Sequence, residues 1–244
     1  MQSLNVSLTN TNSMHYKYLI LVIAFVSFSS PTLANKKFIK STTSTMFFPI
    51  ERRANMVYNL LDSNNLSLPN LISFTEALNG FYDLKNKGII TKDILTIIDF
   101  SLSSTKKRLW IIDLATNTVL LNSLVSHGMN SGGEFANSFS NSNSSNKSSL
   151  GFYSTGEVYK GKHGTSLKLD GLEKGFNNNA RARAVVIHGA NYANPSILKS
   201  QGFLGRSQGC PAVPEGLSLK VINLIKNKSC LFIYHPSRSN KYQA

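Results

Sequence analysis

The stretch Gly205-Arg206-Ser207-Gln208-Gly209-Cys210-Pro211-Ala212-Val213 places a cysteine among residues that form turns. Glycine at position 209 lets the main chain approach a neighbour closely. Pro211 fixes the backbone φ angle directly after the cysteine. The composition therefore predicts a tight turn that presents the Cys210 thiol with backbone N–H groups around it.

A histidine stands 22 positions upstream of this cysteine, at the end of the apolar run Ala184-Val185-Val186-Ile187. A cysteine and a histidine on neighbouring elements are the minimum set for nucleophilic catalysis by a thiol. We expect His188 to lie at the end of a strand, where the carbonyl of Gly189 can fix its tautomer. The chemistry that this pair predicts is acyl transfer through a thioester.

Two features of the turn would help such a reaction. The N–H groups of Gln208, Gly209 and Cys210 can face a developing oxyanion. A helix predicted over 215–226 follows the cysteine, and a helix N-terminus favours negative charge. A buried structural cysteine with a core histidine is the alternative that this pattern leaves open.

The remaining pattern predicts a mainly β fold. Apolar and β-branched runs predict strands at 94–100, 108–114, 119–125, 150–159, 166–169, 183–188 and 230–234. Helical spacing predicts helices over 51–64 and from Pro69 to Tyr82. Residues 126–149 read as a long loop and 190–209 as an irregular connection. We expect a β-sandwich or barrel with peripheral helices and a short N-terminal helical segment, with Trp110 in the core.

The N-terminus has the three-part pattern of a secretory signal peptide over residues 1–34. Lys17 precedes the apolar run Leu19–Phe28, and Thr32-Leu33-Ala34 offers small residues for cleavage. The run is too short to span a bilayer comfortably, although an uncleaved anchor is the alternative reading. We divide the rest into a lead and helical segment that packs on the body (35–87), a catalytic domain (88–236) and a tail (237–244).

The chain has a formal net charge of +14, and removal of residues 1–34 leaves +13. An exported protein this basic is expected to meet an anionic matrix in the periplasm or cell envelope. We expect no nucleic-acid partner, because no DNA- or RNA-binding motif is visible, and no further membrane span.

The chain has two cysteines, and an oxidising compartment makes a bridge between them possible. Cys230 lies in a strand-like run, where a free cysteine acts as a small buried hydrophobe. His127 and His163 each precede a glycine and are expected to face solvent in turns. Together with His188 they lack metal-site spacing, so we expect no metal and no cofactor.

Two segments, Val186-Ile187-His188-Gly189-Ala190 and the cysteine stretch 205–213, together resemble the catalytic domain of the murein L,D-transpeptidases. The similarity is to the branch whose cysteine motif reads G-R-S-x-G-C-P-A-V. Further matches follow in the order of that branch, at Val125–Gly128, Phe139–Asn141, Ser148–Tyr153 and Gly161–Gly164. The resemblance covers roughly residues 90–236.

The resemblance implies a role for each residue of the motif. Cys210 would be the nucleophile, His188 its general base, and Gly189 the source of the orienting carbonyl. Ser207 and Gly209 would shape the oxyanion pocket. The implied fold is a β-sandwich with a cradle for a stem peptide of peptidoglycan.

The implied reaction starts from a donor tetrapeptide stem. The thiolate attacks the carbonyl of the L-centre of the diamino acid at position three and expels the terminal D-alanine. The amine of a second stem then resolves the thioester and gives a 3→3 crosslink. Resolution by water would make the protein an L,D-carboxypeptidase, and a wall-binding module with Cys210 tied to Cys230 is the non-catalytic alternative.

The motif departs from the commonest members at two positions. Those members have a histidine where Gln208 stands, and an arginine or asparagine that contacts substrate where Ala212 stands. We expect Arg206 to replace the latter as the carboxylate binder. The spacing from histidine to cysteine is also longer, so Tyr192 is expected to form part of a different cleft wall, and His163 to line the cleft.

Overall fold

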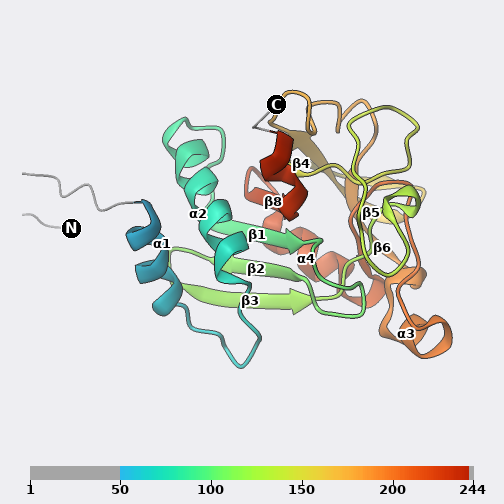
Figure 1. Cartoon of the computed structure of the whole chain (residues 1–244), viewed down its shortest axis with the longest axis horizontal. Coiled ribbons are helices and arrows are strands. Elements are labelled where there is room, and N and C mark those ends of the chain that lie inside the picture. The colour runs from blue at the N-terminus through green and yellow to red at the C-terminus, as the bar shows by residue number, and fades with distance from the viewer. Residues whose placement is uncertain (1–49, 242–244) are drawn as a thin grey trace, which may run out of the picture. The chain divides into compact units, whose positions relative to one another are not determined.

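The computed structural model describes residues 50–241 (Figure 1). The predicted signal peptide (1–34) and the lead at 35–49 lie outside the described residues. Within the described range the fold is mainly β with peripheral helices, as expected from the sequence. No helix in that range is both long and apolar enough to cross a membrane.

Eight strands of the described chain form one sheet in the order β3-β2-β1-β8-β4-β5-β6-β7. Their bounds are β1 Ile94–Asp99, β2 Leu109–Asp113, β3 Thr118–Ser123, β4 Gly151–Gly161, β5 Gly164–Gly171, β6 Val186–Ala190, β7 Ala212–Pro214 and β8 Cys230–Tyr234. The pairs β1–β8 and β6–β7 are parallel, and the other neighbouring pairs are antiparallel.

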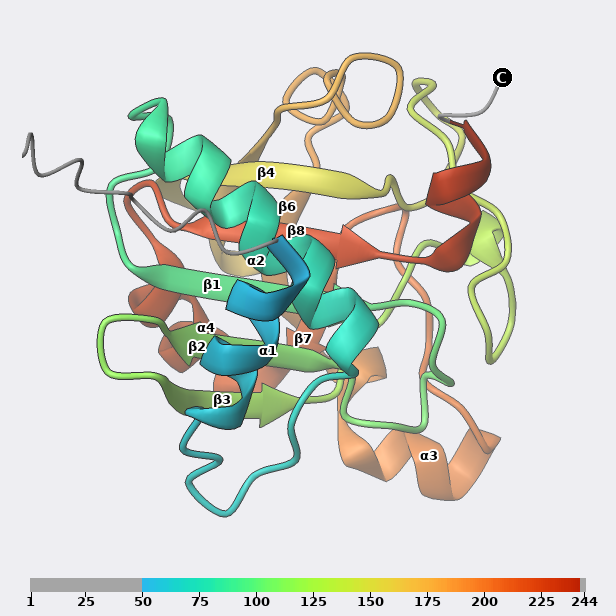
Figure 2. The same cartoon turned by 60° about the vertical axis from the view of Figure 1, so that its left-hand side comes forward.

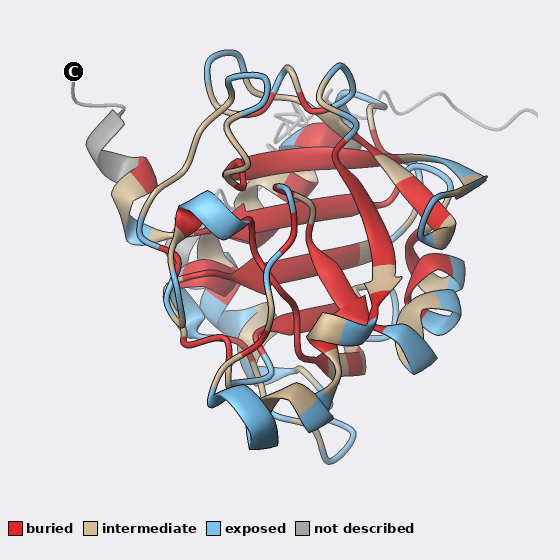
Figure 3. Ribbon diagram, turned by 90° about the vertical axis from the view of Figure 1, so that its right-hand side faces the viewer, coloured by how far each residue is buried: buried red, intermediate tan, exposed pale blue. Residues whose placement is uncertain are grey.

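Strands β1 and β8 are buried along nearly their whole length because both faces of the sheet are covered. Successive side chains of a strand point to opposite faces. In β8, Phe232 packs with one core cluster while Leu231 and Ile233 pack with the other. Figure 3 shows the consequence, since the central strands are coloured as buried along nearly their full length.

Two N-terminal helices cover one face of the sheet, as Figure 2 shows. Helix α1 spans Ile50–Asn59 and α2 spans Leu71–Asn86, and α2 packs on β1 and β8. The Asn70 side chain caps α2 by accepting the N–H of Ile72 at 2.8 Å. Trp110 is 3% exposed within the same cluster, so its predicted core position is confirmed.

The opposite face is covered by helix α4 (Ser218–Ile225), which packs on β1, β5 and β6. The outer strands of the sheet nearly meet there. Ser126, which follows β3, donates its N–H to the carbonyl of Ala212 in β7 at 2.8 Å. This bridge brings the long loop after β3 against the segment that carries Cys210.

Several elements differ from the prediction, and α2 extends beyond its expected end at Tyr82 to Asn86. The first helix ends at Asn59 rather than at 64, and the expected strand 183–188 begins only at Val186. The connection 190–209 contains helix α3 (Pro195–Gln201), which buries no residue. The expected tail contains a 3-10 helix, Pro236–Lys241.

Candidate active site

The cysteine turn is closed by the hydroxyl of Ser207. Its Oγ donates to the carbonyl of Cys210 at 2.6 Å and accepts the N–H of Gly209 at 3.0 Å. Gly209 has a φ of +123°, and a Cβ there would lie 2.9 Å from the carbonyl oxygen of Lys147. Only glycine suits this position. The tight turn expected from the composition is therefore present.

Cys210 is partly exposed, and its sulfur is held by backbone groups that lead into β6. It accepts the N–H of Val186 at 3.4 Å and donates to the carbonyl of Ala184 at 3.6 Å. Cys230 is fully buried on the face of β8 that packs against the N-terminal helices. Both cysteines are free, so the disulfide left open by the sequence does not form.

The predicted helix does not begin directly behind the cysteine. Residues Ala212–Pro214 instead form β7, because they pair with β6 in the register His188 to Ala212. A 3-10 turn, Glu215–Leu217, then precedes α4. The expected support of Cys210 by a helix N-terminus is therefore wrong, and the backbone N–H of Val186 takes that place.

His188 lies in the middle of β6, not at the end of a strand as expected, because the strand continues through Ala190. One of its ring nitrogens is hydrogen-bonded to the backbone. Its Nδ1–H donates to the carbonyl of Gly189 at 3.0 Å, because a carbonyl can only accept. The tautomer therefore leaves Nε2 with a free lone pair. A Cβ on Gly189 would lie 2.8 Å from the Cβ and Oγ of Ser218, so glycine lets the strand approach the start of α4.

The strand register brings the thiol and the imidazole to the same part of the sheet. In the parallel pair of β6 and β7, His188 stands opposite Ala212. Cys210 precedes Ala212 by two residues and its sulfur is bound by the N–H of Val186, which precedes His188 by two residues. Tyr192 adjoins both groups. Its ring lies 6.5 Å from the His188 ring in an edge-on arrangement, and the Cys210 thiolate contributes to raising the pKa of Tyr192.

The pKa values of Cys210 and His188 are both shifted in the direction that favours the neutral form of each group. Burial raises the pKa of Cys210, and the Val186 N–H and the charge of Arg183 partly offset that rise. Burial also lowers the pKa of His188, and the neighbouring imidazole of His163 lowers it further, against the opposing effect of the Gly189 carbonyl. At neutral pH the pair is therefore a thiol beside an unprotonated base.

Two of the predicted substrate-binding residues adjoin His188. His163, exposed at the tip of the β4–β5 hairpin, stacks on His188 with 4.3 Å between ring centroids. Tyr192 lies in the 3-10 turn Asn191–Ala193, and its carbonyl accepts the N–H of Gly205 at 2.8 Å. The pKa of Tyr192 is raised to about 12, mainly by burial and to a lesser degree by the negative charge of the Cys210 thiolate, so this phenol stays neutral.

Arg206 and Gln208 both lie exposed on the cysteine turn. The guanidinium of Arg206 donates to the carbonyl of Gly132 at 3.2 Å and lies over the ring of Phe203. Arg206 is exposed, and a guanidinium suits a carboxylate ligand. Ala212, which stands where the commonest members carry a substrate-contacting side chain, is fully buried in β7.

His127 does not face solvent, contrary to the prediction, and is only 1% exposed. The fully buried Arg108 donates to its Nδ1 at 2.8 Å, and its Nε2 lies 3.4 Å from the carbonyl of Gly132. Burial and the charge of Arg108 lower the pKa of His127 to about 4. The His127 carbonyl in turn accepts the N–H of Ser207 at 2.9 Å, so this buried pair supports the cysteine turn.

Sequence reasoning missed Arg108 and Arg183, two buried or half-buried cations behind the turn. Arg108 donates to the carbonyls of Leu102 and Val125 and to Nδ1 of His127. Arg183 donates to carbonyls and hydroxyls at least 34 positions upstream, so no local pattern marks either residue. Between residues 50 and 241, no group of three or more His, Cys, Asp or Glu is placed to hold a metal ion.

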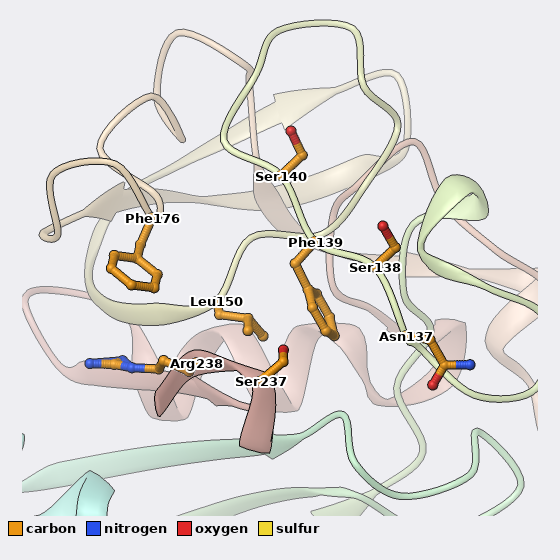
Figure 4. Close-up of a pocket in the computed structure, with 8 residues that line it drawn as sticks. All are labelled: Asn137, Ser138, Phe139, Ser140, Leu150, Phe176, Ser237 and Arg238. Atoms are coloured by element: carbon orange, nitrogen blue, oxygen red, sulfur yellow. The ribbon is translucent and has the colours of Figure 1, made fainter. Parts of the chain in front are cut away.

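A cavity of about 190 Å³ lies between the long loop and the C-terminal 3-10 helix (Figure 4). Its lining residues are Asn137, Ser138, Phe139, Ser140, Leu150, Phe176, Ser237 and Arg238. None of them belongs to the cysteine turn or to β6. The guanidinium of Arg238 lies 3.0 Å from the Glu173 carboxylate, so its charge is compensated.

Comparison with known proteins identifies a family for this chain. A family model described as the L,D-transpeptidase catalytic domain matches residues 67–234. No curated protein matches the chain.

Solved structures with a similar fold include three L,D-transpeptidases. One from Mycobacterium smegmatis is 12% identical with a TM-score of 0.37, and the match covers 59% of each chain. One from Xylanimonas cellulosilytica is 11% identical (TM-score 0.33), with 59% of this chain and 61% of that chain covered. L,D-transpeptidase 1 of Mycobacterium tuberculosis is 10% identical (TM-score 0.32), with 57% and 60% covered. The match thus spans about three fifths of the length of these structures. Since the family model spans well over half of the sequence, the chain belongs to the L,D-transpeptidase catalytic domain family.

Proposed function

We propose that this protein is an exported, cysteine-dependent L,D-transpeptidase that forms 3→3 crosslinks in peptidoglycan. The observation that carries the proposal is the hydrogen bond from the Val186 N–H to the sulfur of Cys210. It holds the thiol against the strand in which His188 donates Nδ1–H to the Gly189 carbonyl. The nucleophile and its base are thus positioned by one strand.

The first half-reaction begins from the neutral pair. The Sγ proton of Cys210 passes to Nε2 of His188, and the thiolate attacks the carbonyl of the L-centre of the third residue of the donor stem. The oxyanion of the tetrahedral intermediate faces the backbone N–H groups of the turn. When this intermediate collapses, the C–N bond to the terminal D-alanine breaks, and the imidazolium protonates the departing amine. A thioester on Cys210 and neutral His188 remain.

The second half-reaction reverses the proton transfer. An acceptor amine from another stem gives its proton to Nε2 of His188 as it attacks the thioester carbonyl. The C–S bond breaks, the thiolate recovers the proton, and the new amide links the two stems. Water in place of the amine would release a tripeptide stem, which is the carboxypeptidase reaction.

The substrate walls in this proposal are the residues around the sulfur. Arg206 is exposed beside Cys210 and suits a stem carboxylate as a charged donor. His163 and Tyr192 flank His188 and suit contact with the peptide backbone. The net charge of +14 favours residence next to an anionic wall, and the sequence pattern of residues 1–34 supports export to the periplasm or cell envelope.

The proposal is tested with the purified chain and a disaccharide-tetrapeptide, with products identified by mass spectrometry. We expect crosslinked dimer and free D-alanine from the wild type and neither from Cys210→Ala. Cys230→Ala is the matched control, because it makes the same chemical change at the fully buried cysteine and should retain dimer formation. Dimer formation by Cys210→Ala would refute the proposal, whereas tripeptide without dimer would assign the carboxypeptidase reaction.

A further inference from the structure

The segment 183–186 wraps around the sulfur of Cys210. The carbonyl of Ala184 accepts from the thiol, and the N–H of Val186 donates to it. Ala184 takes a left-handed backbone conformation with a φ of +52°, which costs energy for a residue with a Cβ. The chain is thus bent sharply next to the nucleophile, directly after Arg183.

The side chain of Arg183 points into the long loop that covers the cysteine turn. Its Nη1 donates to the carbonyl of Ser140 at 2.8 Å and to the hydroxyl of Ser149. Its Nη2 donates to the carbonyl of Lys147 at 2.7 Å and to the Ser145 hydroxyl at 3.2 Å. These contacts fix the loop segment 140–149 against the turn.

The same guanidinium lies against the residue next to the nucleophile. A Cβ on Gly209 would be 3.4 Å from Nη2 of Arg183. The hydrogen-bond acceptors of Arg183 are carbonyls and hydroxyls, which carry no formal negative charge. Its half-buried positive charge is therefore directed at the turn rather than cancelled by a carboxylate.

Arg181, two positions earlier, provides a natural contrast. Its guanidinium pairs with the carboxylates of Asp170 and Glu157 on the β4–β5 hairpin, and it is exposed. The charge of Arg181 is thus compensated on the surface, whereas that of Arg183 is not.

We propose that Arg183 is a positioning residue that holds loop 140–149 against the cysteine turn and stabilises the thiolate of Cys210 while the proton resides on His188. This inference rests on the proposed function for its reaction step. The relevant step moves the Sγ proton to Nε2 and leaves a negative sulfur beside a half-buried cation.

The electrostatics of the site support this role. The charge of Arg183 lowers the pKa of Cys210 against the rise caused by burial. Burial lowers the pKa of Arg183 itself, and the phenol of Tyr153 and the thiolate of Cys210 partly offset that fall. The other titratable groups around the sulfur are the phenol of Tyr192, which is neutral because its pKa is raised to about 12, and the imidazole of His188. The ammonium of Lys147 turns away and donates to the hydroxyl of Ser138 at 2.8 Å.

The test is the pH dependence of alkylation of Cys210 by iodoacetamide in the full chain, with the adduct mapped to Cys210 by peptide mass spectrometry. In Arg183→Gln we expect the alkylation midpoint to rise by about one pH unit, which makes alkylation near neutral pH about tenfold slower. Arg183→Lys should restore most of the shift because it keeps the charge. Arg181→Gln is the matched control and should leave the midpoint unchanged.

A second pair of variants separates charge from loop support. Ser149→Ala removes a loop contact but keeps the cation, and it should leave the midpoint in place. Arg183→Met also removes the charge and should raise the alkylation midpoint as Arg183→Gln does. If a thermal melt shows that Arg183→Gln does not fold, Arg183→Met is measured in its place.

An unchanged midpoint in a folded charge-removing variant would overturn the proposal, as would an equal rise in Ser149→Ala. Because alkylation needs no peptidoglycan substrate, this result is independent of whether the chain forms crosslinks.

Discussion

Replacing Ser207 by alanine tests whether the cysteine turn is rigid because of one buried hydroxyl. The hydroxyl is removed from a side chain that is 4% exposed, and two backbone groups lose their partner. These are the carbonyl of Cys210 at 2.6 Å and the N–H of Gly209 at 3.0 Å. An unsatisfied buried polar group costs about 1–3 kcal/mol, and Cys210 is partly exposed, so water can recover part of the loss. We therefore expect a loss of stability of about 2 kcal/mol.

For a chain of this size, that loss lowers the melting temperature by roughly 4–8 °C. The turn also loses the bond that fixes the backbone of Cys210, and a small displacement of a reacting group can reduce the rate by about 100-fold. The assays are a thermal melt by circular dichroism and the kcat/KM of D-alanine release. Ser200→Ala is the control, because its hydroxyl makes one exposed hydrogen bond to the Ile197 carbonyl in α3. A Ser207→Ala protein with the melting temperature and kcat/KM of that control would refute the reasoning.

Three further predictions concern His188 and its neighbours. Gly189→Ala should displace the end of β6 from Ser218 and lower the free energy of unfolding by about 1–3 kcal/mol. Ser218→Gly in the same chain should recover part of that loss, as measured by denaturant unfolding in a double-mutant cycle. Full additivity of the two changes would contradict the predicted contact. Because the pKa of His188 is lowered, the base stays unprotonated and kcat/KM should hold to a pH below the ordinary histidine value near 6.5. His163→Ala exposes the His188 ring and removes the second imidazole, so the acid limb of the kcat/KM profile should move to higher pH, and a limb that stays in place or moves lower would contradict this assignment.

The sequence predicted the central strands well because their signal is local. β1 and β8 are short apolar runs bounded by polar residues, and their observed bounds lie within one residue of the predicted ones. Cys230 was placed correctly in a buried strand for the same reason. Helix α3 was missed because it buries no residue, although Pro195 at its start and Gly202 in a left-handed conformation at its end mark its limits.

The sequence motif of the candidate site could be predicted, but the side-chain contacts that hold the motif in place could not. Cys210 and His188 stand out as a turn cysteine and a strand histidine. The burial of His127 depends on Arg108, which lies 19 positions away and reaches it only in the folded sheet. The acceptors of Arg183 are likewise 34 to 43 positions upstream. Such contacts follow from the topology of the sheet and leave no periodic pattern in the chain.

The central claim of the account is that the acyl group passes through the sulfur of Cys210. The direct measurement is to quench the wild type in acid during turnover of a tetrapeptide stem, determine the intact mass, and map any adduct by peptide sequencing. The account predicts a mass increase equal to the tripeptide acyl group, located on Cys210 and absent from Cys210→Ala. An acyl group on another residue, or D-alanine release that continues in Cys210→Ala, would contradict it.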